Sequence, residues 1–390
     1  MKKFNCNMIV FFFACIFVIY GVWGECFNNM IHSGMDVAHC IKKGDFGTAY
    51  MVMNMVETNT VKKQNYHDRL LDINSLKENI FGTRVIMKED TIVAKSDEGF
   101  LLGYFDDELD DSLAIDEWLA AIRKNQQLAE KNGAHYLYCA VPAKTFYFRE
   151  PLNVTSYNKI NYDNKINILS DSDIPFIDFY DVFEEKHVSK EDMFFITDHH
   201  WKPQSGFLAN KIISEKLSDL YGFNYNKKAT DLDNYIITTY PNWFLGSYGK
   251  KAGTFFTWYG ADDFDLITPK FETDFTENIA SNGTVRKGRF EETVLHMEKM
   301  KKDYYHVFPY STYSGGDFRL QIIRNNLIPE GKKILILRNS FSCVITPFLA
   351  LQAGELHIID DREGDYPSGE KVNIENYIVT EKPDYVIEVK

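Results

Sequence analysis

The chain lacks a surplus of positive charge: 43 lysines and arginines stand against 56 aspartates and glutamates, for a formal net charge of -13. Nucleic-acid binding is therefore not expected, because little basic charge is available to neutralise phosphates. The sequence also lacks an internal repeat, a low-complexity tract and a glycine-rich loop of the kind that opens a helix at nucleotide sites. With 45% hydrophobic and 15% aromatic residues over 390 positions, it is predicted to be globular, as one large domain or two ordinary ones.

Spacings typical of a metal site are also missing. Asp198, His199 and His200 could be joined by His135 or His187 around an ion, but adjacent histidines in a strand point in opposite directions. No cysteine or glutamate is spaced to complete such a site. We therefore predict neither a metal nor another cofactor.

The first 24 residues have the pattern of an export signal. Lys2 and Lys3 precede an almost wholly apolar run over 8–23, and Val22 and Gly24 are the small residues expected before a signal-peptidase cut. If it is not cut, the run is slightly short for a bilayer span but could act as an anchor. Either way, the rest of the chain is predicted to be extracytoplasmic, secreted or held at the outer face of the membrane.

Apolar residues recur with helical and strand periods from residue 111 onward. Helices are expected over 111–131, 204–221 and 347–352, and strands over 136–141, 176–179, 333–337, 356–359 and 385–389. This alternation predicts an α/β domain over 111–390 with a mainly parallel central sheet covered on both faces. Residues 222–330 lack a regular pattern and are rich in aromatics, so an irregular insertion is expected there. Residues 25–110 are predicted to form an N-terminal extension packed on the core.

The stretch 194–206, which reads FFITDHHWKPQSG, places an acid, two imidazoles and an indole side by side. Residues 193–196 are strand-like and Pro203 can begin a helix, so we expect the cluster at a strand-to-helix junction. Such junctions at the carboxyl ends of strands bind ligands in α/β proteins. Asp198 and His200 are two residues apart and can share one face of the backbone, where the carboxylate holds one ring nitrogen while the other takes a proton. This pair is half of a hydrolytic triad, and it needs a nucleophile.

Ser340 is the candidate nucleophile. It follows the predicted strand 333–337 and precedes the predicted helix 347–352, so a tight turn would expose its hydroxyl and aim backbone N–H groups at an oxyanion. A serine hydroxyl attacks poorly until a base takes its proton, and a buried acid keeps that base in the right tautomer. Spacing alone leaves open whether His199 or His200 is the base, because His199 could swing round in a turn.

The motifs resemble those of the DHHW proteins, which are grouped with the SGNH-hydrolase-like domains of the alginate O-acetyltransferases of bacterial envelopes. The likeness is carried by Thr197 to Trp201, Phe244 to Ser247 with Gly249 and Lys250, Asp262 to Phe264, Pro269 to Phe271, Ser340 and Phe341 with Pro347 to Leu349, and Asp360 to Arg362. The order, with the acid and histidine first and the serine last, is similar to the acetyltransferase branch and permuted relative to ordinary SGNH esterases. The resemblance implies an SGNH-hydrolase-like three-layer sandwich with Ser340 as nucleophile, His200 as base and Asp198 as the group that orients it.

An exported enzyme that transfers or removes an acyl group, most simply acetyl, on a cell-envelope polysaccharide is the function that this resemblance implies. Trp201, Gly316, Asp317 and Arg362 are weaker candidates for substrate binding. Because acetyl-CoA is cytoplasmic, a membrane-bound acyltransferase is the implied acyl donor. One departure supports an alternative: Asn339 stands where the family usually has aspartate. A catalytically degenerate carbohydrate-binding or scaffold protein of the envelope is therefore the rival reading.

Overall fold

The computed structural model describes residues 64–88, 91–105, 108–149, 156–364 and 367–390. Contacts divide the chain into two compact units, Met1–Asn74 and Ser75–Lys390. Of the first unit only residues 64–74 are described, and they belong to helix α4 (Gln64–Ile80). The predicted export segment, residues 1–24, lies outside the described residues. Within the described part of the chain, no helix is long and apolar enough to cross a bilayer.

The secondary structure of the second unit alternates helices and strands. Its helices are α5 (Ser112–Lys131), α6 (Asn158–Ser170), α7 (Phe179–Glu185), α8 (Lys190–Met193), α9 (Pro203–Tyr221), α10 (Ser247–Ala252), α11 (Phe290–Thr293), α12 (Thr346–Ala350) and α13 (Ile374–Glu381). Its strands are β1 (Val85–Lys88), β2 (Thr91–Lys95), β3 (Leu101–Tyr104), β4 (His135–Ala140), β5 (Phe176–Asp178), β6 (Tyr235–Phe244), β7 (Asp262–Pro269), β8 (Phe275–Ile279), β9 (Thr284–Gly288), β10 (Leu320–Asn325), β11 (Lys333–Arg338), β12 (Glu355–Asp360) and β13 (Tyr385–Val389). Short 3₁₀ helices are η1 (Lys144–Tyr147), η2 (Lys227–Thr230), η3 (Leu232–Asn234), η4 (Thr254–Phe256), η5 (Met297–Lys299), η6 (Pro309–Tyr313) and η7 (Ser340–Val344).

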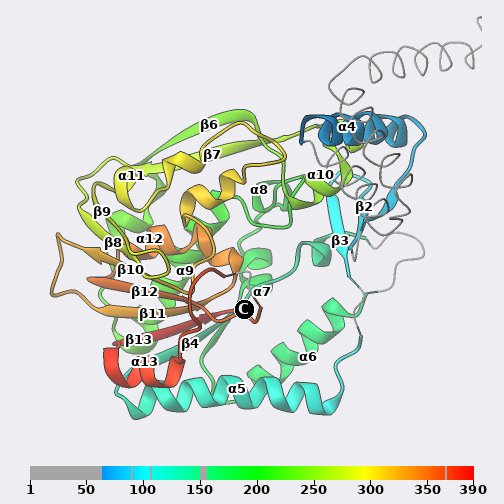
Figure 1. The fold of residues 1–390 in the computed structure, drawn as a ribbon. Helices are drawn as coiled ribbons and strands as arrows, with labels where there is room; N and C mark the ends of the chain where they lie inside the picture. Colours follow the sequence, from blue (N-terminus) through cyan, green and yellow to red (C-terminus); the bar gives the residue numbers. More distant parts are fainter. Residues whose placement is uncertain (1–63, 89–90, 106–107, 150–155, 365–366) are drawn as a thin grey trace, which may run out of the picture. The chain divides into compact units, whose positions relative to one another are not determined.

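Among the described residues, eight strands form the central sheet in the order β5-β4-β13-β11-β12-β10-β8-β9 (Figure 1). The first five of these run parallel to one another, and β10, β8 and β9 extend the sheet with antiparallel pairing. The predicted mainly parallel sheet is therefore confirmed. Because Arg338 pairs with Asp360, the carboxyl ends of β11 and β12 lie side by side, and the segments that follow them are brought together.

Helices cover both faces of the sheet. On one face, Tyr138 of β4 belongs to a core cluster that contains Ile122 of α5 and residues of α6 and α13. On the other face, Leu137 of β4 belongs to the larger cluster that contains Ile213 of α9 and residues of α12. Figure 1 shows α5 and α13 on the opposite side of the sheet from α9 and α12. Since neighbouring residues of a strand point to opposite faces, this alternation produces the predicted three layers.

The two long predicted helices begin and end where local chemistry requires. The side chain of Asp111 accepts from the N–H of Ala114, 2.8 Å away, at the start of α5, and Gly133 follows the helix with φ of 83°. Helix α9 has Pro203 at its first position and ends at Gly222, whose φ is 70°. Proline fits the first turn because its missing N–H would have no partner there, and glycine reaches positive φ without strain.

The segment 222–330 is more regular than its sequence indicates. Its strands β6 and β7 form a two-stranded antiparallel sheet, while β8, β9 and β10 continue the central sheet beyond β12. The strands that pair with them lie far away in the sequence, so the local pattern of apolar residues does not predict the pairing. Strands β1, β2 and β3 form a separate antiparallel sheet within the second unit. The domain boundaries drawn from the sequence remain predictions.

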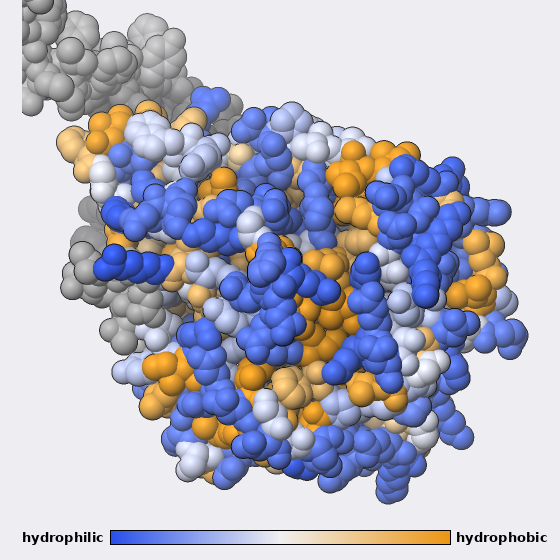
Figure 2. All heavy atoms as spheres, turned by 180° about the vertical axis from the view of Figure 1, so that it is seen from behind, coloured by the Kyte–Doolittle hydropathy of each residue, from blue (hydrophilic) through white to orange (hydrophobic). Residues whose placement is uncertain are grey.

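The face seen in Figure 2 is mostly hydrophilic, with hydrophobic residues in separate patches. Exposed apolar side chains come from several elements, among them Leu113 of α5, Ile160 of α6 and Val379 of α13. Scattered residues of this kind are normal on a folded domain and do not by themselves mark a binding site.

Candidate active site

The acid and the two histidines lie in a loop rather than at the end of a strand. Helix α8 ends at Met193, and residues 194–201 form a short loop closed by an antiparallel bridge between Phe194 and Trp201. The expected strand at 193–196 is therefore wrong. In place of a sheet neighbour, the carboxylate of Asp262 accepts from the N–H of Ile196, at 2.5 Å, and of Thr197, at 2.8 Å. A side chain from β7 thus satisfies backbone groups that a strand would have paired in a ladder.

Ser340, His200 and Asp198 form a continuous hydrogen-bonded chain. The Oγ atom of Ser340 lies 2.8 Å from Nε2 of His200, and Nδ1 of the same ring lies 2.7 Å from Oδ2 of Asp198. An ionised carboxylate only accepts, so the proton resides on Nδ1 and Nε2 is left to accept from the serine hydroxyl. This is the geometry of a serine nucleophile, a base and an orienting acid.

Electrostatics keep the acid charged and the base neutral. Burial raises the pKa of Asp198, but the charges of His200 and His199 outweigh it and hold that pKa well below its usual range. Burial, followed by the neighbouring charge of His199, lowers the pKa of His200 to about 4, against the opposing effect of Asp198. The imidazole is therefore unprotonated at neutral pH, which is the form a general base requires.

His199 occupies a different position from His200. Its side chain is 34% exposed, and its Nδ1 lies 2.9 Å from Oγ of Ser247. The two rings lie against each other with centroids 3.7 Å apart, but it is His200 that reaches Ser340. Of the two histidines that spacing left open, His200 therefore lies within hydrogen-bonding distance of Ser340, and its role as the base stays a prediction.

Asp198 is held from behind by the start of α10. The backbone N–H of Ser247 donates to Oδ1 of Asp198 over 2.9 Å, and the Ser247 hydroxyl donates to the same oxygen over 2.5 Å. Gly246 precedes it, and a Cβ there would lie 2.2 Å from Cβ of Asp198. Only glycine permits this close approach, which explains the Gly-Ser pair in one of the sequence motifs.

Ser340 begins η7 directly after β11. The side-chain oxygen of Asn339 accepts from the N–H of Phe341 at 3.0 Å, so the amide caps the first turn as an aspartate would. The departure from the family's aspartate therefore leaves the local turn intact. The N–H groups of Phe341 and Ser342 both donate to Asn339, so the oxyanion site expected at this turn remains a prediction.

Of the four weaker candidates, Asp317 and Arg362 lie in an ion-pair network. Arg338 is buried between Asp317, 3.0 Å away, and Asp360, 3.7 Å away, and Arg362 contacts the same two carboxylates at 2.9 and 2.5 Å. Gly316, with φ of 145°, accepts from Arg338 through its carbonyl at 2.9 Å. Arg338 and Asp360 end β11 and β12, Arg362 follows β12, and Gly316 and Asp317 precede β10. The order of these strands in the sheet therefore brings the residues together. Arg362 keeps a side chain that is 30% exposed and so can still face a ligand.

Trp201, the remaining weak candidate, does not face a substrate. Its side chain is 0% exposed and packs edge-on against Phe179, Phe183 and Phe341. Because Trp201 also closes the loop by pairing with Phe194, its indole anchors the loop in the core. The expectation that it binds substrate is therefore wrong, because the indole is buried among these aromatic rings.

The described residues contain one group with the donors for a metal ion. The ligand atoms of Asp198, His199 and His200 lie within 4.8 Å of one another. However, Nε2 of His200 faces Ser340, and Asp198 already accepts from His200 and Ser247. The atoms that could bind a metal ion are thus already used in hydrogen bonds with Ser340, Ser247 and each other, so these residues do not fit a metal centre.

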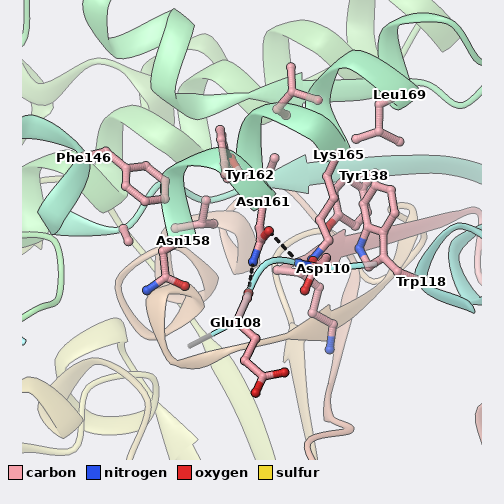
Figure 3. Close-up of a pocket in the computed structure, with 15 residues that line it drawn as sticks. Glu108, Asp110, Trp118, Tyr138, Phe146, Asn158, Asn161, Tyr162, Lys165 and Leu169 are labelled. Carbon is pink, nitrogen blue, oxygen red and sulfur yellow. Dashed lines mark hydrogen bonds and ion pairs between the residues drawn. The ribbon is translucent and has the colours of Figure 1, made fainter. Parts of the chain in front are cut away.

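A cavity of about 500 Å³ lies on the α5 side of the sheet (Figure 3). Aromatic rings of Trp118, Tyr138 and Tyr162 line it, and the amide of Asn161 bridges two backbone groups there, accepting from the N–H of Asp110 and donating to a neighbouring carbonyl. Neither Ser340, His200 nor Asp198 lines this cavity. The candidate triad is therefore recognised by the geometry of its side chains and not by this cavity.

Comparisons with known proteins agree with this arrangement. Residues 100–236 match the ALGX family, described as the SGNH hydrolase-like domain of the acetyltransferase AlgX. The structure is similar to that of Bacillus cereus PatB1 with a sulfonyl adduct, with a TM-score of 0.61 and 21% identity, over 77% of this chain and 95% of that chain. It is also similar to a DHHW family protein from Eubacterium siraeum, with a TM-score of 0.55 and 18% identity, over 78% of this chain and 91% of that chain. A comparison with curated protein sequences gave no match.

The fold is thus the SGNH-hydrolase-like α/β fold. Residues 100–236 are similar to the SGNH hydrolase-like domain of the acetyltransferase AlgX, and the predicted resemblance to the DHHW proteins is confirmed.

Three residues of the site escaped the sequence reasoning. Ser247 and Asp262 belong to motifs that carry the family resemblance, but the sequence does not indicate which groups their side chains contact. Lys144, whose ammonium group contacts the carbonyl of Asp198 at 2.9 Å, had no signal at all. A single lysine in an apolar segment gives no periodic or spacing pattern, and only the fold shows where it points.

Proposed function

We propose that this protein is an acyltransferase or esterase of the Ser-His-Asp type that acts on an O-acyl group, most simply acetyl, of a cell-envelope polysaccharide. The observation that supports it is the unbroken chain from Ser340 through His200 to Asp198, with both hydrogen bonds below 3 Å. The relation to SGNH-like acetyltransferases supports the acetyl group as the one transferred.

In the first half of the reaction, Nε2 of His200 takes the hydroxyl proton as Oγ of Ser340 attacks the acyl carbonyl. Asp198 stabilises the imidazolium that forms. The tetrahedral oxyanion is expected beside Ser340 at the start of η7, with the N–H of Ser340 as the donor proposed to stabilise it. The imidazolium then gives its proton to the departing donor oxygen, which leaves an acyl ester on Ser340.

In the second half, His200 takes a proton from the incoming hydroxyl as that oxygen attacks the acyl ester. A sugar hydroxyl gives an acylated polysaccharide, while water gives free acid. Breakdown of the second tetrahedral intermediate returns the proton to Oγ of Ser340. The same three residues therefore serve a transferase and an esterase, and the acceptor that reaches the site decides between them.

The proposed acyl donor is a membrane-bound acyltransferase. The signal-like segment 1–24 supports an extracytoplasmic location, where acetyl-CoA is not present. The alternative is a degenerate protein that binds carbohydrate without turnover, and Asn339 is the residue that favours it.

The test is covalent labelling of the purified protein with a fluorophosphonate. We expect wild type to be labelled at Ser340, Ser340→Ala not to be labelled, and His200→Ala to react far more slowly. Because PatB1 carries a sulfonyl adduct, a sulfonyl fluoride serves as a second reagent. Wild type that resists both reagents while folded would leave the carbohydrate-binding alternative standing.

A second measurement separates the two enzyme classes. The protein is given a soluble acyl donor with or without an oligosaccharide acceptor, and products are followed by mass spectrometry. Acylated oligosaccharide indicates transfer. Free acid formed at the same rate in both reactions indicates an esterase.

A further inference from the structure

A lysine with no assigned task lies directly behind the catalytic loop. Lys144, at the start of η1, is 3% exposed. Its ammonium group donates to four backbone carbonyls: those of Phe195 at 2.7 Å, Ile196 at 3.0 Å and Asp198 at 2.9 Å, and that of Leu101 on β3 at 2.7 Å. Three of these acceptors belong to the loop that presents Asp198 and His200.

This environment is unusual for a lysine, because the acceptors of its ammonium group within the described part of the chain are peptide carbonyls and not carboxylates. An ammonium group has three protons, so four carbonyls share them, and the charge is held by peptide dipoles. Burial lowers the pKa of Lys144 to about 7, while the negative charges of Asp262 and Asp198 act in the opposite direction. Lysine is thus kept in a place that disfavours its charge, which indicates that its contacts there are required.

Asp262 holds the same loop by its N–H groups. Besides the two backbone donors of Ile196 and Thr197, its carboxylate accepts from the hydroxyl of Thr197 at 2.5 Å. Asp262 is 6% exposed. Within the segment 195–198, Lys144 therefore donates to three carbonyls and Asp262 accepts from two backbone N–H groups.

Resting on the proposed function, we propose that Lys144 and Asp262 are a pair of positioning residues that fix the loop 195–198 and so hold the carboxylate of Asp198 on Nδ1 of His200. Neither touches the reacting atoms. The loop is not part of a sheet: its ends are joined by the bridge between Phe194 and Trp201, and its backbone accepts single hydrogen bonds from Leu101 of β3 and from Gly249. Lys144 and Asp262 add hydrogen bonds to its carbonyl and N–H groups from side chains of opposite charge. A displacement of about 1 Å at such a site can cost roughly a hundredfold in rate.

A lysine that merely stabilised the fold would behave differently. Its removal would lower the melting temperature, yet the folded fraction would keep a normal hydrogen bond between His200 and Asp198. The deciding readout is therefore the downfield NMR signal of the proton on Nδ1 of His200, which reports that bond without any turnover. The signal is assigned by its absence in His200→Ala.

The central variant is Lys144→Met, which keeps the length of the side chain and removes the ammonium group. We expect the downfield signal to be lost or broadened and fluorophosphonate labelling of Ser340 to slow by roughly a hundredfold at a temperature where the variant is folded. Lys333→Met is the matched control, because Lys333 pairs with Glu381 at the far, amino end of β11. It should keep the signal and label within about threefold of wild type, as expected for a surface substitution.

If Lys144→Met does not fold, Asp262→Asn takes its place, because it conserves shape while it removes the charge and one of the two acceptor oxygens. The double variant Lys144→Met with Asp262→Asn completes a cycle, and we expect its loss in labelling rate to be smaller than the product of the two single losses, because neither charge is left buried alone.

The outcomes separate the two proposals. An intact downfield signal with an unchanged labelling rate in folded Lys144→Met, or in Asp262→Asn, overturns the positioning role and leaves the proposed function standing. Wild type that does not react while its downfield signal depends on Lys144 overturns the proposed function and supports the positioning role. Single losses that simply multiply in the double variant overturn the pairing of the two charges.

Discussion

Replacing Asp198 by asparagine should stop catalysis by reversing the tautomer of His200. The backbone N–H of Ser247 donates to Oδ1 of Asp198 at 2.9 Å and cannot change its direction. In the variant, this N–H selects the amide oxygen for that position. The amide NH₂ group then faces Nδ1 of His200, which must accept, so the ring proton moves to Nε2. A protonated Nε2 can no longer take the proton of Ser340.

The magnitude follows from this loss of the reactive tautomer. The change from aspartate to asparagine in a serine triad lowers the rate by roughly 10⁴, which corresponds to about 5 kcal/mol in activation free energy. Stability should change far less, since asparagine fills the same space. We expect the rate of fluorophosphonate labelling at Ser340, measured under excess reagent, to fall by this factor while circular dichroism stays unchanged.

The role of the N–H in setting the direction of the amide can be tested separately. The hydroxyl of Ser247 is the second donor to Oδ1 of Asp198, and Ser247→Ala removes it while keeping the N–H. Because the N–H alone still selects the amide oxygen, Asp198→Asn with Ser247→Ala should label as slowly as Asp198→Asn alone. Ser247→Ala alone is the control. A labelling rate for Asp198→Asn within tenfold of wild type, or a recovery in the double variant when the control is folded and reactive, would refute this reasoning.

The remaining predictions concern the base, its neighbour and the cap of the serine turn. Burial and the charge of His199 lower the pKa of His200 to about 4, so the base stays unprotonated as pH falls through 6.5. The rate of Ser340 labelling should therefore decline only near pH 4. A decline with its midpoint at pH 6 or above, with the fold intact, would contradict this. His199→Ala should label within about tenfold of wild type, whereas His200→Ala should lose nearly all reactivity. Equal losses at the two histidines would argue against the assignment. Asn339→Ala should lower the free energy of unfolding by about 1 kcal/mol because Phe341 loses its cap, and Asn339→Asp should not; urea unfolding of both variants decides, and equal stability of the two would show that the cap contributes nothing.

The elements that form the fold could be predicted because their signals are local. Helices α5 and α9 have apolar residues at helical spacing, with Asp111 or Pro203 at the start and Gly133 or Gly222 at the end. Strands β4, β11, β12 and β13 are apolar runs bounded by polar residues, as expected when both faces are covered. Asp198 and His200 are two residues apart, and Ser340 follows a strand directly. Each of these features depends on neighbours within a few positions, so the sequence alone was sufficient.

What the tertiary structure decided involves partners far apart in the chain. The choice of His200 over His199 depends on the loop's closure between Phe194 and Trp201 and on Ser340, 140 residues away. The burial of Trp201 could not be read from a motif in which an aromatic residue is equally suited to bind sugar. The strand-like residues 193–196 form no strand: Met193 ends α8, and the side chains of Lys144 and Asp262 contact the backbone groups of Phe195 and Ile196. Periodicity reports which face of an element is apolar, but it cannot report which distant charge will complete its hydrogen bonds, and that is settled only when the chain is folded.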